Sequence, residues 1–151
     1  MKYFDYDFKH AKLILHEMEM LREIEDILEG TNFKLGRNVK PSPSIALREL
    51  FIKKGWQKEY KVSERSELLR FDLFKNNIAV EIQLSDPADC YNDYLKFLLA
   101  YNVERIEVGI EIVYDDSIIG KNLPKLSKVK NDLNIFRRIQ SCPIWVIGLK
   151  N

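Results

Sequence analysis

Cysteine and histidine are both scarce in this chain of 151 residues, and their scarcity excludes several kinds of site. The two cysteines, Cys90 and Cys142, are too few for a disulfide framework and do not form a CxxC pair, so we expect buried free thiols. The only histidines are His10 and His16, which cannot build a histidine-rich metal site. The sequence also lacks a Ser-His-Asp set and a phosphate-binding glycine loop.

Long apolar runs and a strong net charge are absent as well. No apolar run approaches the length of a membrane-spanning helix, and residues 1–7 lack the design of a signal peptide. The formal net charge is only +1, so the overall charge does not indicate a nucleic-acid-binding protein. Hydrophobic residues make up 46% and charged residues 31% of the chain, which is ordinary for a globular domain with its own core. We therefore expect one cytoplasmic domain, residues 1–151, without a membrane partner.

The stretch of residues 70–84 has the pattern of a tight β-hairpin. Two runs of alternating apolar and polar residues flank Asn76 and Asn77, and asparagine tolerates the left-handed backbone of a two-residue turn. With these residues in the turn, Asp72 lies opposite Glu81. The other pairs expected from this register are Lys75 with Ile78, Leu73 with Val80, Phe71 with Ile82, and Arg70 with Gln83.

Alternation along the strands makes one face of this hairpin apolar and places the two carboxylates on the other. Carboxylates about 5 Å apart repel each other by roughly 3 kcal/mol at an effective dielectric near 20. A shared divalent cation would remove this repulsion, and Mg²⁺ favours one or two carboxylates together with water and phosphate oxygens. The alternative is an exposed hairpin whose acids are solvated and screened by Arg70.

The remaining periodicity predicts a mixed central sheet flanked by helices. Helices are expected at residues 9–29, 43–54, 88–101 and 127–139, and strands at 56–62, 105–114 and 143–149, besides the hairpin at 67–84 and an extended piece at 3–8. The middle of the chain then has the order αβββαβ, an α/β (α+β) fold. The expected parts are an N-terminal helix (1–30), a catalytic core (43–114) and a basic helix with the last strand (115–151).

An Asp, a Glu nine residues later, a spacer and a polar residue on this core resemble the PD-(D/E)xK nuclease motif. Gln83 stands where that superfamily usually has a lysine. Glutamine in such a run, here residues 80–83, is typical of the BglII/BstYI group of type II restriction endonucleases. Four further stretches are similar to that group and lie in the same order, at residues 5–15, 43–56, 106–112 and 142–149.

The resemblance implies a homodimer that uses Mg²⁺ to cleave both strands of a short palindromic site in double-stranded DNA. Carried over by position, Asp72 and Glu81 bind the metal, the backbone carbonyl of Ile82 completes the protein ligands, and Gln83 positions the attacking water. The cation would polarise the phosphate and lower the pKa of bound water. The run after Gln83, residues 84–89, departs from the family pattern, as does the short segment before the hairpin, so the DNA target is not predicted.

Two further residues are candidates for the catalytic site. Glu49 lies on the first core helix, where related nucleases often place an extra acid that faces the metal; otherwise it is a solvated helix charge. His10 lies at a helix start and would touch a phosphate or the metal site, or else it is structural.

Basic residues supply candidate contacts to DNA phosphates. Arg70 would contact a phosphate or neutralise the two acids of the hairpin. Residues 117–138 carry six basic residues against one acid, and from this segment Lys121, Lys125 and Lys128 are predicted phosphate contacts. The alternative is a solvated basic face. Two other functions stay open, a DNA-binding protein on the same fold without cleavage and a structure-specific repair or nicking nuclease.

Overall fold

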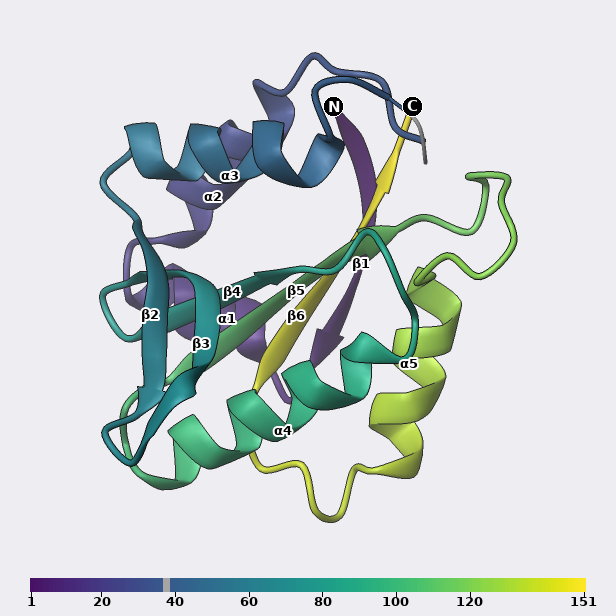
Figure 1. Cartoon of the computed structure of the whole chain (residues 1–151). Coiled ribbons are helices and arrows are strands. Elements are labelled where there is room, and N and C mark those ends of the chain that lie inside the picture. The colour runs from purple at the N-terminus through teal and green to yellow at the C-terminus, as the bar shows by residue number, and fades with distance from the viewer. Residues whose placement is uncertain (37–38) are drawn as a thin grey trace.

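Six strands form one sheet between two layers of helices in the computed structural model, which describes residues 1–36 and 39–151 (Figure 1). The elements are, in order, β1 (Lys2–Phe8), α1 (Ala11–Glu17), α2 (Leu21–Glu29), α3 (Pro43–Lys53), β2 (Gln57–Ser63), β3 (Ser66–Lys75), β4 (Ile78–Ile82), α4 (Asp89–Asn102), β5 (Val108–Tyr114), α5 (Leu126–Ile135) and β6 (Ile144–Lys150). The predicted αβββαβ core, here α3 to β5, is confirmed, and the fold is α+β.

The order of strands in the sheet is β1-β6-β5-β4-β3-β2. The pairs β4–β5 and β5–β6 are parallel because a helix returns the chain between them, whereas the consecutive strands β2, β3 and β4 are antiparallel. Parallel strands end at the same edge of a sheet. The carboxyl end of β4 therefore lies beside the carboxyl end of β5, and the candidate catalytic residues fall at this edge.

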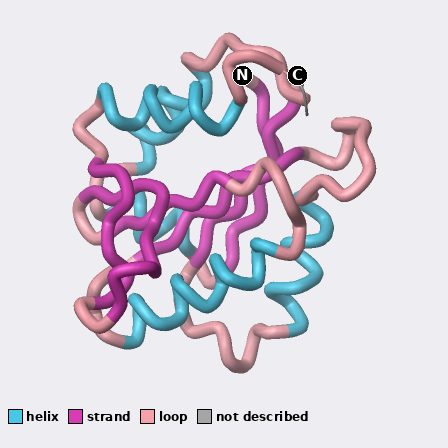
Figure 2. The backbone as a smooth tube through the Cα atoms, viewed as in Figure 1, coloured by secondary structure: helices cyan, strands magenta, loops and turns pink. Residues whose placement is uncertain are grey.

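Each face of the sheet is covered by its own helices, as Figures 1 and 2 show. The helices α1, α2 and α3 pack on one face through one apolar cluster, and α4 and α5 pack on the other through a second. Every residue of β4 and β5 is buried, so both strands lie inside the molecule. Both cysteines are buried free thiols, as predicted. No helix in the described part of the chain is both long and apolar enough to span a membrane.

The N-terminal region differs from the single helix predicted for residues 9–29. It forms two helices, α1 and α2, because Glu19 adopts a left-handed backbone (φ 58°) that interrupts the helical hydrogen bonding. The extended piece before them is β1, which pairs antiparallel with β6 from Lys2 opposite Lys150 to Phe8 opposite Ile144. The N-terminal segment thus supplies an edge strand of the sheet as well as helices.

The turn of the predicted hairpin is confirmed. Asn76 and Asn77 both have positive φ angles, 49° and 60°. The three pairs next to the turn also have the predicted register, and they are Lys75 with Ile78, Phe74 with Ala79, and Leu73 with Val80. The asparagines therefore do fix the register of β3 against β4.

Beyond these pairs the hairpin opens, so the predicted pair of Asp72 with Glu81 is not formed. The prediction that Phe71 pairs with Ile82 on one apolar face with Leu73 is also wrong. Phe71 instead packs on the opposite face, where its ring stacks on Phe97 of α4 at a centroid distance of 5.8 Å. On β2, Glu59 lies between residues paired to β3 and has a left-handed backbone (φ 53°), which disturbs strict alternation at this level. We call the opening between β3 and β4 the fork.

Candidate active site

A polar cleft of about 360 Å³ lies at the fork, between α3 and α4. Its walls come from α3, β3, β4, the loop after β4, and α4. The lining residues are Ser44, Arg48, Asp72, Glu81, Ile82, Gln83, Ser85, Asp89, Asn92, Asp93 and Lys96. The structure thus brings the predicted Asp72, Glu81, Ile82 and Gln83 together in one cleft.

Asp72 is held at the fork by both of its carboxylate oxygens. The Oδ2 atom accepts a hydrogen bond from the backbone N–H of Ile82 at 2.9 Å. This side chain takes the place of a backbone carbonyl of β3, because the two strands no longer pair at this level. The Oδ1 atom accepts from Nη2 of Arg48 on α3 at 2.6 Å. Because both oxygens are engaged, the side chain is oriented by a strand on one side and a helix on the other.

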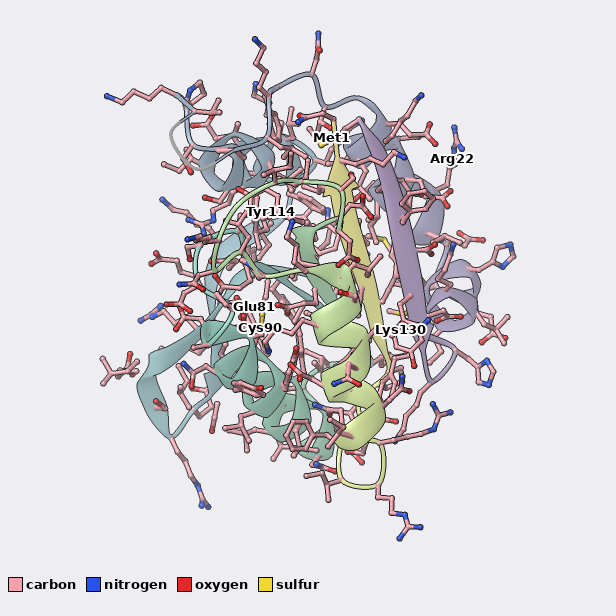
Figure 3. All side chains as sticks on the ribbon, turned by 90° about the vertical axis from the view of Figure 1, so that its right-hand side faces the viewer. Met1, Arg22, Glu81, Cys90, Tyr114 and Lys130 are labelled. Atoms are coloured by element: carbon pink, nitrogen blue, oxygen red, sulfur yellow. The ribbon has the colours of Figure 1, made fainter. Side chains whose placement is uncertain are left out.

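Glu81 is almost completely buried, with 4% of its surface exposed. Figure 3 shows it in the interior of the molecule, in contrast to Arg22, which projects at the periphery. Its Oε1 atom lies 2.5 Å from Nζ of Lys96 on α4. Burial raises the pKa of Glu81 well above its usual value, and the nearby Asp93 carboxylate raises it further, while Lys96 opposes both effects. A cation at this carboxylate therefore favours the ionised form.

Gln83 follows at the mouth of the cleft and is fixed by its neighbours. Its Oε1 atom accepts the hydroxyl of Ser85 at 2.8 Å, and its Nε2 atom donates to Oδ2 of Asp93 at 3.4 Å. Its backbone N–H donates to the carbonyl of Ile112 on β5 at 2.9 Å. An amide offers both a donor and an acceptor without net charge, which suits a group that orients a water molecule.

A second glutamate lies behind Glu81 and was not among the predicted site residues. Glu111 on β5 is in register with Glu81 on the parallel strand β4 and is fully buried. Within residues 1–36 and 39–151 neither of its carboxylate oxygens has a hydrogen-bond partner. Burial raises the pKa of Glu111 well above its usual value, and the carboxylates of Asp93 and Glu81 raise it further. Burial and the two neighbouring carboxylates thus favour the protonated form of this side chain.

This raised pKa makes a prediction about stability. A carboxyl whose pKa is higher in the folded than in the unfolded state stabilises the fold fully below its unfolded pKa, and this stabilisation is lost as the pH rises toward the folded pKa. We expect Glu111→Gln to remove that loss. The free energy of unfolding of the variant relative to the unmodified protein should then rise by about 1.4 kcal/mol per pH unit. This corresponds to a rise in melting temperature of about 3 °C per pH unit.

The measurement is thermal unfolding of both proteins between pH 5 and pH 8. Glu107→Gln is the matched control, because Glu107 precedes the same strand but is exposed to solvent. A difference in melting temperature between Glu111→Gln and the unmodified protein that stays constant with pH would contradict a raised pKa of Glu111.

The two additional catalytic candidates lie away from the cleft. Glu49 is exposed on α3, and its neighbour Arg48 faces the cleft instead. His10 is exposed and follows β1, whose last residue pairs with the first residue of β6. Since β4, β5 and β6 are parallel, this places His10 at the opposite end of the sheet from Ile82. The structure therefore brings neither candidate to Asp72.

The predicted phosphate contacts are also outside the cleft. Arg70 does not pair with Gln83; its guanidinium donates to the backbone carbonyls of Glu59 and Glu67. A second set lies in and after the loop that follows β5: Lys121 is exposed, Lys125 donates to the carbonyl of Ile118, and Lys128 pairs with Asp132 at 2.5 Å. Their contact with DNA remains a prediction.

Four charged residues that the sequence analysis did not predict complete the cleft. They are Arg48 on α3, and Asp89, Asp93 and Lys96 on α4. Asp93 and Lys96 are three residues apart on a helix, a spacing that places two side chains on the same face, and both side chains are nearly buried. This spacing was the available signal, but the sequence does not say which face of α4 meets the sheet.

The donors at the fork fit a hard divalent cation. They are the carboxylates of Asp72 and Glu81 with the backbone of Ile82, and Mg²⁺ takes one or two carboxylates while keeping water and phosphate oxygens as its other ligands. In the parts of the chain that are described, no three His, Cys, Asp or Glu side chains form a cage that would hold a metal on protein ligands alone. The chemistry of the donors is thus that of a site completed by solvent and substrate.

Comparison with known proteins identifies the family. A family model described as restriction endonuclease BglII/BglIII matches residues 3–149. The structure of restriction endonuclease BglII complexed with a DNA 16-mer aligns with 100% of this chain and 79% of its own, at 18% identity and a TM-score of 0.86. Free BglII aligns with 100% of this chain and 80% of its own, at 21% identity and a TM-score of 0.77. No curated protein matches. This chain therefore belongs to the BglII/BglIII restriction endonuclease family, and so to the type II site-specific deoxyribonucleases.

Proposed function

We propose that the protein is a Mg²⁺-dependent endonuclease that hydrolyses phosphodiester bonds within a specific sequence of double-stranded DNA. The observation that carries this proposal is the cleft at the fork, where Asp72, Glu81 and Gln83 come together in a chain of this family. The similar structure of BglII bound to DNA supports DNA as the substrate.

Seven residues of the cleft have a part in this proposal. Asp72, Glu81 and the carbonyl of Ile82 would hold the cation, which supplies Lewis-acid polarisation of the phosphate and a water of lowered pKa. Gln83 orients the attacking water through its amide, which Ser85 and Asp93 hold in place. Arg48 keeps Asp72 pointed into the cleft. No covalent nucleophile is required.

We further propose that two copies associate through the outer face of α4. Leu95 and Leu98 form a ridge between two mainly apolar hollows of about 200 and 480 Å³, one toward Phe136 and Ile139 and the other toward Leu69. A ridge beside a groove on one surface suits a two-fold interface, in which the ridge of each copy enters the groove of the other. The 63% exposure of Leu95 and the 64% exposure of Ile139 are then explained by burial in the dimer.

Supercoiled plasmid DNA of known sequence, incubated with the protein and Mg²⁺, tests this function against its alternatives. We expect discrete linear fragments whose mapped ends share one sequence, and no products when EDTA replaces Mg²⁺. Nicked circles without linear product would favour a nicking or repair nuclease. Retained DNA binding without any product would favour a binding protein on the same fold.

A further inference from the structure

Lys96 is the most enclosed cation of the cleft, and it contacts the proposed metal site directly. Its Nζ atom lies 2.5 Å from Oε1 of Glu81 and 2.8 Å from Oδ1 of Asp93. A third oxygen, the backbone carbonyl of Arg70, accepts from it at 3.3 Å. The three oxygens come from β4, α4 and β3, and only 14% of the lysine side chain is exposed. The ammonium group is thus surrounded by oxygen ligands, as a bound cation would be.

The charges around Lys96 explain why a cation is needed there. Besides the exposed Asp89, the carboxyl groups of Asp72, Glu81 and Asp93 line the cleft, and the lining contains two cationic side chains, Arg48 and Lys96. Arg48 is engaged by Asp72, so Lys96 is the cation that serves both Glu81 and Asp93. Buried carboxylates without a partner are strongly destabilising, so the metal-free protein depends on this lysine.

We propose that Lys96 is a built-in counter-ion that occupies the cation position at Glu81 and that a divalent metal displaces. On metal binding the ammonium group leaves Glu81 and stays with Asp93, its neighbour at a spacing of three residues on α4. Lys96 is in this sense a positioning residue: its ammonium group holds the Glu81 carboxyl group in the cleft before the metal arrives. The inference rests on the proposed metal site, and it adds a competitor for that site.

This arrangement lowers the affinity for metal while stabilising the metal-free fold. A monovalent cation within ion-pair distance of Glu81 must be moved before a second cation can approach, because like charges at such distances repel. Removal of the lysine charge should therefore move the two properties in opposite directions, with weaker folding and tighter metal binding. A residue with a purely structural part would lower stability and leave metal affinity unchanged or reduce it.

The test is calorimetric titration with Ca²⁺ alone, without DNA, together with thermal unfolding in the presence and absence of Ca²⁺. For Lys96→Met we expect a dissociation constant about tenfold lower than that of the unmodified protein, since a competing positive charge has been removed. Without Ca²⁺ the variant should melt several degrees lower, and Ca²⁺ should restore most of that loss. Lys96→Arg keeps the charge and should retain the metal affinity of the unmodified protein.

Lys75→Met is the matched control, because it also removes a partly buried ion pair between a lysine and a glutamate. Lys75 lies 2.9 Å from Glu23 at the turn end of the hairpin, so its removal should lower stability without changing Ca²⁺ affinity. Unchanged or weaker Ca²⁺ binding by Lys96→Met overturns the counter-ion proposal. If Asp72→Asn abolishes Ca²⁺ binding in the same experiment, the proposed metal site still stands. Absence of Ca²⁺ binding by the unmodified protein would overturn both the metal site and the counter-ion.

Discussion

Asp72→Asn should abolish DNA cleavage, with a loss on the order of a thousandfold or more in the rate of linear-product formation. Asparagine retains an oxygen that can accept the backbone N–H of Ile82, so the fork itself should persist. The substitution removes the negative charge that would bind the cation and leaves Arg48 without its ion-pair partner. The expected variant is therefore folded but inactive.

Glu81→Gln should give a loss of the same order. The replacement has the same size as the buried glutamate and removes a carboxylate whose charge burial already opposes, so folding should tolerate it. Cleavage of plasmid DNA, measured at several Mg²⁺ concentrations, distinguishes a weakened metal site from a general loss of function. Activity that returns at high Mg²⁺ would indicate reduced affinity for the cation.

Glu49→Gln provides the control for both variants, because Glu49 is exposed on α3 outside the cleft. We expect it to cleave at the rate of the unmodified protein, and a strong loss there would support the sequence prediction of an additional catalytic acid. If either Asp72→Asn or Glu81→Gln retained cleavage within tenfold of the unmodified protein, the assignment of the catalytic site would be wrong.

The second large effect is expected from two lysines placed on the proposed dimer face. Leu95→Lys combined with Ile139→Lys puts like charges onto both sides of the apolar hollow on α4. In a two-fold interface each charge is introduced twice, and buried unpaired ammonium groups are strongly unfavourable. We expect the protein to sediment as a monomer and double-strand cleavage to fall at least about tenfold, since two positions are disrupted in each copy.

Ile119→Lys is the matched control for this pair, because Ile119 is 99% exposed in the loop before α5 and does not line the hollow. It should leave both the sedimentation behaviour and the cleavage rate unchanged. Analytical ultracentrifugation and plasmid cleavage report on the two properties separately. A double variant that remains dimeric would show that the α4 face is not the interface, whatever its effect on cleavage.

Local signals explain which parts of the fold could be predicted. Asn76 and Asn77 fixed the turn and the register of the three nearest pairs, because the left-handed conformations of a two-residue turn depend only on these residues. The order of helices and strands around this hairpin followed from periodicity, and it was confirmed. A family resemblance then identified the correct family from short collinear stretches.

The surroundings of the proposed catalytic residues depended on contacts that no local pattern specifies. Glu49 and Arg48 are adjacent on α3, and which of the two faces the cleft depends on how the helix is rotated against the sheet. Glu111 reaches the site only through the parallel pairing of β4 with β5, which brings together residues far apart in the sequence. Phe71 left its expected face because β2 and β3 lose strict alternation next to Asp72.

The hydrogen bond between the Ile82 amide and the Asp72 carboxylate makes the exchange rate of this amide hydrogen sensitive to the proposed metal site. The amide hydrogen of Ile82 is held by a side chain of the proposed metal site at 2.9 Å, whereas that of Gln83 is held by the backbone carbonyl of Ile112 at the same distance. Amide hydrogen exchange at these two neighbouring positions would therefore respond differently when a cation draws on the Asp72 carboxylate. The ratio of the two exchange rates therefore reports whether the Asp72 carboxylate still accepts the Ile82 amide hydrogen, and no DNA substrate is needed for the measurement.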